Sequence, residues 1–166
     1  MMTSFEEGRL VEFIKESNGI ENLWHEPGEA EIEAYKNFLE LDQITVAHLE
    51  AFVTSIAGQR AGLRVSPGMD VIVGAHVPPR GGPRIYSNLV HLLYEISAPG
   101  KTLDDIFRDH VQYETLHPFM DGNGRSGRAI WLWQMVLNYR DISQVLQIPF
   151  LQRFYYQTLA YCQFPD

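Results

Sequence analysis

The spacing of apolar residues predicts helices over most of the chain. In three segments of the first 57 residues, apolar side chains recur at intervals of three and four, as they do on one face of an α-helix. We expect the second and third of these helices to lie side by side, and the first to run into the turn-forming residues 17–19. The apolar positions are Leu10, Val11, Phe13 and Ile14 in residues 5–16, then Ile32, Tyr35, Phe38 and Leu39 after Pro27-Gly28, and then Val46, Leu49, Phe52, Val53 and Ile56.

The second half of the chain predicts further helices. Pro83 suits a first helical position, where its fixed φ angle helps and its missing N–H is not needed, and Thr102 with Asp105 resembles a capping box. Residues 125–139 are apolar on nearly all sides, which predicts a helix at the centre of the core. A last helix is predicted over residues 150–161, with no assigned role. The expected buried faces are Ile85, Leu89, Leu92, Leu93 and Ile96 after Pro83, and Leu103, Ile106, Phe107 and Val111 after Thr102.

One segment departs from the helical pattern. In residues 64–73, the turn residues Ser66-Pro67-Gly68 separate two short runs of β-prone residues, as in a small hairpin. The expected fold class is therefore mainly α with a small β-hairpin. The length of 166 residues suits one compact domain, so we expect residues 1–166 to form a single domain.

Composition and charge exclude several classes of protein. The formal net charge of -8 argues against a protein that holds nucleic acid by bulk electrostatics. The first 50 residues hold twelve acidic and three basic side chains, so the excess of acid lies there. The longest apolar run, residues 129–137, falls far short of the ~20 residues that cross a bilayer, and the acidic start differs from a secretory signal. The single cysteine, Cys162, cannot form an internal disulfide, which fits a reducing cytoplasm.

Residues 117–128 carry the candidate chemistry. Pro118 ends the preceding helix, and the turn Gly122-Asn123-Gly124 permits positive φ angles and delivers its N–H groups to the start of the next helix. Such a turn binds anions, and Arg125 and Arg128 add charged, bidentate donors suited to phosphate. The segment therefore predicts a site for a polyphosphate ligand.

Two side chains beside this turn suit reaction chemistry. Asp121 could hold Mg²⁺, because this ion is usually bound in phosphoryl sites by one or two carboxylates together with the phosphates of the ligand. His117, with an ordinary pKa of about 6.5, could take a proton from an attacking hydroxyl at neutral pH. For His110, two helical turns earlier, the pattern favours a buried, hydrogen-bonded histidine over a metal pair with His117.

The same letters contain a dinucleotide-binding pattern that we reject. Gly122, Gly124 and Gly127 spell G-x-G-x-x-G, but that fingerprint follows a β-strand within a βαβ unit, and here a helix precedes it. Asp141 lies where an acidic ribose ligand would be expected, but no second parallel strand is predicted. The Lys of a Walker phosphate loop is also missing.

Residues 117–128 match the signature H-x-F-x-[DE]-G-N-G-R-x-x-R, and in this the chain resembles the Fic family of AMP transferases. A chance match of the seven fixed letters is on the order of one in ten million. The resemblance implies a Fic-like helical bundle, His117 as general base, Asp121 as the Mg²⁺ ligand and ATP as substrate. It implies that phosphates are bound by Gly122, Asn123, Gly124, Arg125, Ser126, Gly127 and Arg128, with Asn123 and the two flanking amides at the α-phosphate and the arginines at the β- and γ-phosphates.

Two further features follow from the resemblance. The related Doc toxins, which resemble kinases, carry Ala and Lys where this chain has Gly122 and Arg125, so adenylyl transfer is favoured over phosphoryl transfer. About residues 62–80 would form a hairpin flap to which a target segment adds as a strand, so that backbone hydrogen bonds position its hydroxyl. The expected target-binding residues are Val71, Ile72, Val73 and Gly74.

The N-terminal part resembles the inhibitory segment that one subclass of the family carries. Ser17 to Asn22 fits the inhibitory pattern [ST]-x-x-x-E-[GN], and Thr3 to Gly8 fits it as well. We favour the first match, with Ser17 and Glu21 in about residues 1–27, because the apolar Ile20 before Glu21 resembles the usual form. The Glu21 carboxylate would occupy Arg128 in place of the γ-phosphate, so that ATP would bind unproductively.

The resemblance therefore implies a cytoplasmic protein that transfers AMP from MgATP to a Ser, Thr or Tyr hydroxyl of a target protein, with inhibition by Glu21. Two alternatives stay open, namely removal of AMP from modified proteins and a nucleotide-binding regulatory module without turnover. Neither nucleic acid nor a membrane is an expected partner. Self-modification and a homo-oligomer also stay open.

Overall fold

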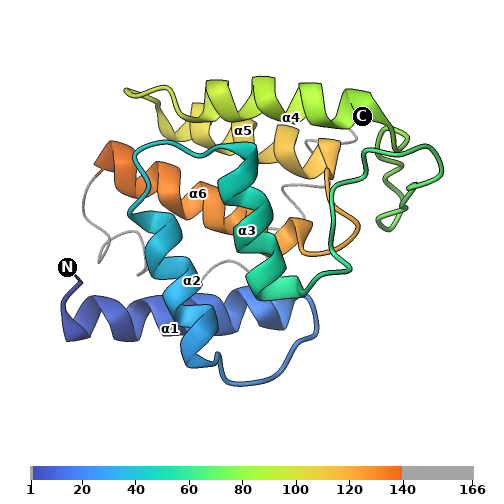
Figure 1. Ribbon diagram of the computed structural model, residues 1–166. Coiled ribbons are helices and arrows are strands. Elements are labelled where there is room, and N and C mark those ends of the chain that lie inside the picture. The colour runs from blue at the N-terminus through green and yellow to red at the C-terminus, as the bar shows by residue number, and fades with distance from the viewer. Residues whose placement is uncertain (1, 140–166) are drawn as a thin grey trace.

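Helix α6 (Asn123–Tyr139) runs through the middle of the computed structural model, which describes residues 2–139 (Figure 1). It packs against α1 (Ser4–Ile20), α2 (Glu29–Leu39), α3 (Val46–Ala57) and α5 (Leu103–Leu116), and α4 (Pro83–Ile96) packs on α5 and α3. Ala129, Ile130 and Leu132 of α6 are fully buried. The described residues thus form a bundle of six helices, and the predictions of a mainly α fold and of a central helix over residues 125–139 are confirmed.

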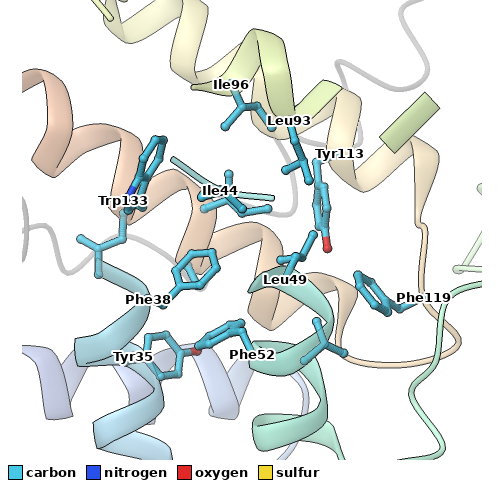
Figure 2. Packing of buried hydrophobic residues seen from close by; sticks show 14 of the residues in the cluster. Tyr35, Phe38, Ile44, Leu49, Phe52, Leu93, Ile96, Tyr113, Phe119 and Trp133 are labelled. Carbon is cyan, nitrogen blue, oxygen red and sulfur yellow. The ribbon is translucent and has the colours of Figure 1, made fainter. Parts of the chain in front are cut away.

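Aromatic contacts join α2 to α3, as the apolar spacing predicted. The ring of Phe52 lies 5.0 Å from that of Tyr35 in an edge arrangement and 4.5 Å from that of Phe38. Figure 2 shows these rings in one cluster with Leu49 and Trp133. The cluster brings residues of α2, α3 and α6 together, so the inner helices share one core.

Helix α1 continues four residues beyond its predicted end. Ser17, Asn18 and Gly19 stay helical and are buried, although their types favour a turn. The amide of Asn18 donates to Glu31 of α2 at 3.0 Å, and Ser17 contacts α6. Tertiary hydrogen bonds therefore override the local preference of these residues.

Helices α4 and α5 begin as predicted, but α5 buries a different face. Pro83 lies in the first turn of α4, and Thr102 with Asp105 forms a capping box. The predicted buried residue Leu103 is exposed, and α5 instead buries Asp109, His110, Tyr113 and Glu114 besides Ile106. These polar groups have partners, for example an ion pair of Asp109 with Lys101 and a hydrogen bond from Gln134 to Asp109. The apolar spacing could not reveal a buried face of paired polar groups.

The predicted hairpin at residues 64–73 is wrong. The described residues of this segment form no strand, because the backbone of Arg64 pairs elsewhere: its N–H donates to Pro118 and its carbonyl accepts from Gly82. Leu63, just before this segment, makes a bridge to Phe119 at the turn that follows α5. A second bridge joins Val73 to His76 across a tight turn at Gly74, whose φ is 60°. The flap is therefore a loop with one short turn.

Residues 140–166 lie outside the part of the chain that the structure describes. The expectations for a helix at 150–161, for Asp141 and for Cys162 fall there. Among the described helices, none is both long and apolar enough to cross a lipid bilayer.

Candidate active site

His117 ends α5 in a left-handed conformation. Its φ and ψ are 49° and 62°, and its N–H closes the helix by donating to Tyr113 at 2.9 Å. A right-handed conformation before Pro118 is disfavoured because the proline ring would clash with the preceding residue. The left-handed form costs about 1–2 kcal/mol for a residue other than glycine, so the surrounding contacts must hold it. The Pro118 signal in the sequence predicted this end of the helix.

The turn from His117 to α6 is locked by the side chain of Asn123. Its Oδ1 accepts from the Phe119 N–H and its Nδ2 donates to the Phe119 carbonyl, both at 2.8 Å. Gly122 has a φ of 79°, and a Cβ there would press on Ala57 of α3. The side-chain amide of Asn123 thus fixes the shape of the turn. Because this group is already engaged, Asn123 would contact an anion through its backbone N–H.

Arg128 lies one turn inside α6 and binds the end of α1. Its Nε donates to the Ser17 hydroxyl at 2.8 Å, and its Nη2 donates to the Ser17 carbonyl at 2.9 Å and to Glu21 Oε1 at 2.7 Å. Arg128 is buried, whereas the Glu21 side chain is 37% exposed. The structure therefore brings Arg128 to Ser17 and Glu21, which precede it by more than 100 residues in the sequence.

Asn22 explains the last letter of the inhibitory pattern. It has a φ of 59°, its N–H donates to Gly19, and the next N–H, of Leu23, donates to Asn18. This is a Schellman ending, whose left-handed residue is usually Gly and sometimes Asn. The [GN] position therefore turns the chain sharply after Glu21. We did not single out Asn22 from the sequence, although its residue type carried the signal.

The structure separates the two matches to the inhibitory pattern. Glu7, from the match at Thr3 to Gly8, forms an ion pair with Lys36 of α2 at 2.8 Å. Glu21 forms one with Arg128 at 2.7 Å. Only the second match places its carboxylate on an arginine of the 117–128 segment.

The Glu21 carboxylate lies at the amino end of α6. A Cβ built on Gly124 would overlap with Glu21 Oε1 and would lie 3.1 Å from Arg128 Nη1. The first N–H groups of a helix have no partner within the helix and favour a negative group. The space beside Gly124 and Arg128 therefore already holds one anionic oxygen, that of Glu21. The donors around it, the Arg128 guanidinium and the first N–H groups of α6, suit a phosphate.

The other predicted phosphate ligands have additional contacts. Arg125 donates from Nη1 to Ile56 at the end of α3, and its Nε is buried with no partner among residues 2–139. The Ser126 hydroxyl is buried against Tyr113, at 2.7 Å. A Cβ on Gly127 would overlap with the Glu114 carboxylate of α5. Ser126 and Gly127 thus pack α6 on α5.

Asp121 is exposed in the turn, and its Oδ1 accepts from the Gly122 N–H at 2.6 Å. Within residues 2–139 no three His, Cys, Asp or Glu side chains gather into a metal site formed by protein ligands alone. One carboxylate together with ligand phosphates is the usual set for Mg²⁺ in phosphoryl sites. The position of Asp121 next to the amino end of α6 fits that type of site.

Two histidines, His110 within α5 and His117 at its end, have lowered pKa values that favour the neutral form. Burial, assisted by the positive charge of Arg64, lowers the pKa of His117 to about 4. Burial and the charge of Arg128 lower the pKa of His110 to about 3. His110 Nδ1 donates to the Gly127 carbonyl at 3.1 Å, so the prediction of a buried, hydrogen-bonded histidine is confirmed. A neutral His117 can accept a proton at physiological pH.

The lowered pKa values predict a protein that loses stability in mild acid. Below pH 6.5 the unfolded chain binds a proton at each of these histidines, and the folded chain does not until its pKa is reached, about 4 for His117 and about 3 for His110. Each histidine then removes about 1.4 kcal/mol of unfolding free energy per pH unit. Urea unfolding at pH 7.0, 6.0 and 5.5 would measure the slope. His110→Gln is expected to reduce it by one histidine's share, and His91→Gln, at an exposed position, is the matched control. An equal slope in His110→Gln would contradict the assignment.

The loop expected to bind the target is exposed beside His117. Ile72 and Val77 are largely exposed, Val73 is partly so, and Val71 and Gly74 lie in the same loop. His76 reaches from this loop to α5, where its Nε2 lies 3.0 Å from the Thr115 carbonyl. The contact places the tip of the loop next to the end of α5.

Arg64 was missed in the sequence. Its side chain is fully buried and binds the His117 carbonyl at 2.7 Å and the Leu116 carbonyl at 3.0 Å. A charged residue between Leu63 and Val65, in an apolar setting, was the available signal.

Comparison with protein families supports the match of residues 117–128. The model of the Fic/DOC family matches residues 35–135, a span that contains these residues and the loop at 62–80. Helix α1, with Ser17 and Glu21, precedes the matched span.

Proposed function

This chain belongs to the Fic/DOC family, and from that premise we propose that it transfers AMP from MgATP to a Ser, Thr or Tyr hydroxyl of a target protein. The family is known for this and related transfer reactions. The observation that carries the proposal is the placement of a neutral His117 one short turn before the amino end of α6, where Arg128 holds an anionic oxygen.

In the proposed reaction, His117 removes the proton of the target hydroxyl while the hydroxyl oxygen forms a bond to the α-phosphorus of ATP. The bond from that phosphorus to the bridging oxygen breaks, and pyrophosphate leaves. The first amides of α6 stabilise the negative charge on the phosphate oxygens. Arg128 holds the terminal phosphate. Mg²⁺ on Asp121 would neutralise phosphate charge.

We propose further that Glu21 inhibits this reaction from within the chain. The contact of Glu21 Oε1 with Arg128 Nη2 supports this, because the carboxylate takes the donor that a γ-phosphate would use. The closeness of Glu21 to Gly124 supports it as well, since an oxygen already lies at the amino end of α6. ATP bound beside Glu21 would have its phosphates displaced from the productive position.

The test compares two labels. The Glu21→Gly variant, incubated with Mg²⁺ and a native lysate, is expected to transfer label from α-labelled ATP to protein and none from γ-labelled ATP. Transfer from the γ-label alone would mean phosphoryl transfer. Glu7→Gln is the matched control, because Glu7 fits the same pattern but pairs with Lys36, and it is expected to label no more than the unmodified chain.

The same experiment separates the alternatives. If the unmodified chain releases AMP from labelled proteins faster than Glu21→Gly does, removal of AMP is the main activity. Tight ATP binding without transfer or release in any variant would leave a regulatory binding module.

A further inference from the structure

Arg64 is a buried arginine whose side-chain hydrogen bonds all go to backbone carbonyls. Its Nε donates to His117 at 2.7 Å and its Nη2 to Leu116 at 3.0 Å. Its Nη1 donates to Met69 at 3.1 Å and to Pro79 at 2.9 Å. The planar guanidinium presents its donors in a rigid fork. One side chain therefore binds four acceptors at once in a fixed geometry.

These acceptors belong to two segments that are distant in sequence. Leu116 and His117 are the end of α5, and Met69 and Pro79 stand at the two ends of the loop at residues 70–78. The backbone of Arg64 joins the same segments, since its N–H donates to Pro118. In Figure 1 the loop between α3 and α4 lies beside the turn from α5 to α6. Arg64 thus links the exposed loop to the turn that carries His117.

The electrostatics of the site suit this link. A buried charge is unfavourable unless hydrogen bonds and opposite charge compensate it. The last carbonyls of a helix carry partial negative charge, and α5 offers two of them to the guanidinium. The contact also holds the carbonyl of His117, whose left-handed backbone is unfavourable by itself.

We propose that Arg64 is a positioning residue for the transfer reaction, which sets the loop that receives the target at a fixed place relative to His117. The inference rests on the proposed function, because it takes His117 as the base and the loop as the target site. Arg64 is fully buried, so it would touch neither ATP nor the target. Its loss would act on the geometry between hydroxyl and base and would leave the ATP site at α6 intact.

The test introduces Arg64→Lys into the Glu21→Gly chain. Lysine keeps the charge but cannot span both segments, because it lacks the planar fork. With dilutions of a lysate as the source of acceptor protein, transfer per acceptor is expected to fall about tenfold or more. The KM for ATP is expected to stay within about twofold. Arg84→Lys, at an exposed position of α4, is the control and is expected to change neither value.

A second variant keeps the inference testable if Arg64→Lys does not fold. Pro79→Gly, at an exposed position, leaves Arg64 in place and loosens the segment that carries one of its acceptors. It is expected to raise the KM for the acceptor without raising that for ATP. Loss of ATP binding and transfer by the same factor in both variants would mean a merely structural role and would overturn the proposal.

Amide hydrogen exchange tests whether Arg64 links the loop to the end of α5, even if no transfer occurs. In Arg64→Lys or Pro79→Gly, exchange is expected to become faster in peptides from residues 69–79 and from residues 113–120 together, with α1 to α3 unchanged. Exchange that changes in only one of the two peptides would overturn the link. Absence of transfer in the Glu21→Gly parent would instead count against the proposed function.

Discussion

A Glu21→Gly variant is expected to transfer AMP to acceptor proteins about ten to a hundred times faster than the unmodified chain. A hydrogen bond to a charged group contributes about 1.5–3 kcal/mol, and each 1.4 kcal/mol is a factor of ten. Because the Glu21 side chain is 37% exposed, its contact with Arg128 belongs toward the lower end of that range. Initial rates of label transfer from α-labelled ATP would measure the effect.

Two variants show whether the carboxylate itself is responsible. Glu21→Gln keeps the shape and one acceptor oxygen but removes the charge, so its rate is expected to fall between those of the unmodified chain and Glu21→Gly. The ATP affinity of Glu21→Gly should rise as well, since Arg128 becomes available to a phosphate. A rate for Glu21→Gly no higher than that of the unmodified chain would refute inhibition by Glu21.

His117→Ala, made in the Glu21→Gly chain, is expected to lower the transfer rate by a factor of about 10² to 10⁴, the usual contribution of a general base. The imidazole is half-buried at the end of α5, so alanine leaves the ATP site at α6 unchanged. Equilibrium binding of ATP should therefore stay within about twofold. Single-turnover label transfer measures the chemical step directly.

The pH dependence of the parent chain provides a check on the same role. In the unmodified chain, burial and the charge of Arg64 lower the pKa of His117 to about 4, with smaller effects of His76 and Glu21. Glu21 raises this pKa, so its loss in the parent chain keeps His117 neutral over the same pH range. The transfer rate is therefore expected to stay level from pH 8 to pH 5.5. A rate that halves near pH 6.5, or a His117→Ala chain as active as its parent, would argue against His117 as the base.

The helices were predictable because each buries an apolar stripe with the period of an α-helix. Ile85, Leu89 and Ile96 are buried in α4 as expected. The period failed for α5, where Asp109 and His110 take buried positions because partners from other segments satisfy them. The hairpin failed for a related reason: the backbone of Arg64 pairs with Pro118 and Gly82, which no local pattern announces.

The candidate site was predictable to the extent that its residues are adjacent in sequence. Residues 117–128 form one turn and one helix start, so their spacing alone indicated an anion site. The pairing of Glu21 with Arg128 came only from the resemblance, because 107 positions separate them. The sequence assigned no role to Arg64 or to Asn22. Arg64 acts through carbonyls that are distant in sequence, and Asn22 acts through its backbone angle.

The helix that carries Glu21 is also part of the core. Leu10, Phe13, Ile14 and Ile20 of α1 are buried, and at about 1.5–3 kcal/mol each they contribute roughly 6–12 kcal/mol. The entropy lost in ordering the helix opposes this contribution. Release of the proposed inhibitor Glu21 needs only fraying of the last turn of α1, a local opening of low free energy that leaves Leu10, Phe13 and Ile14 buried. The proposed inhibitor and the proposed active site thus belong to one folding unit, and the proposed activation would act on the last turn of α1 rather than on the whole helix.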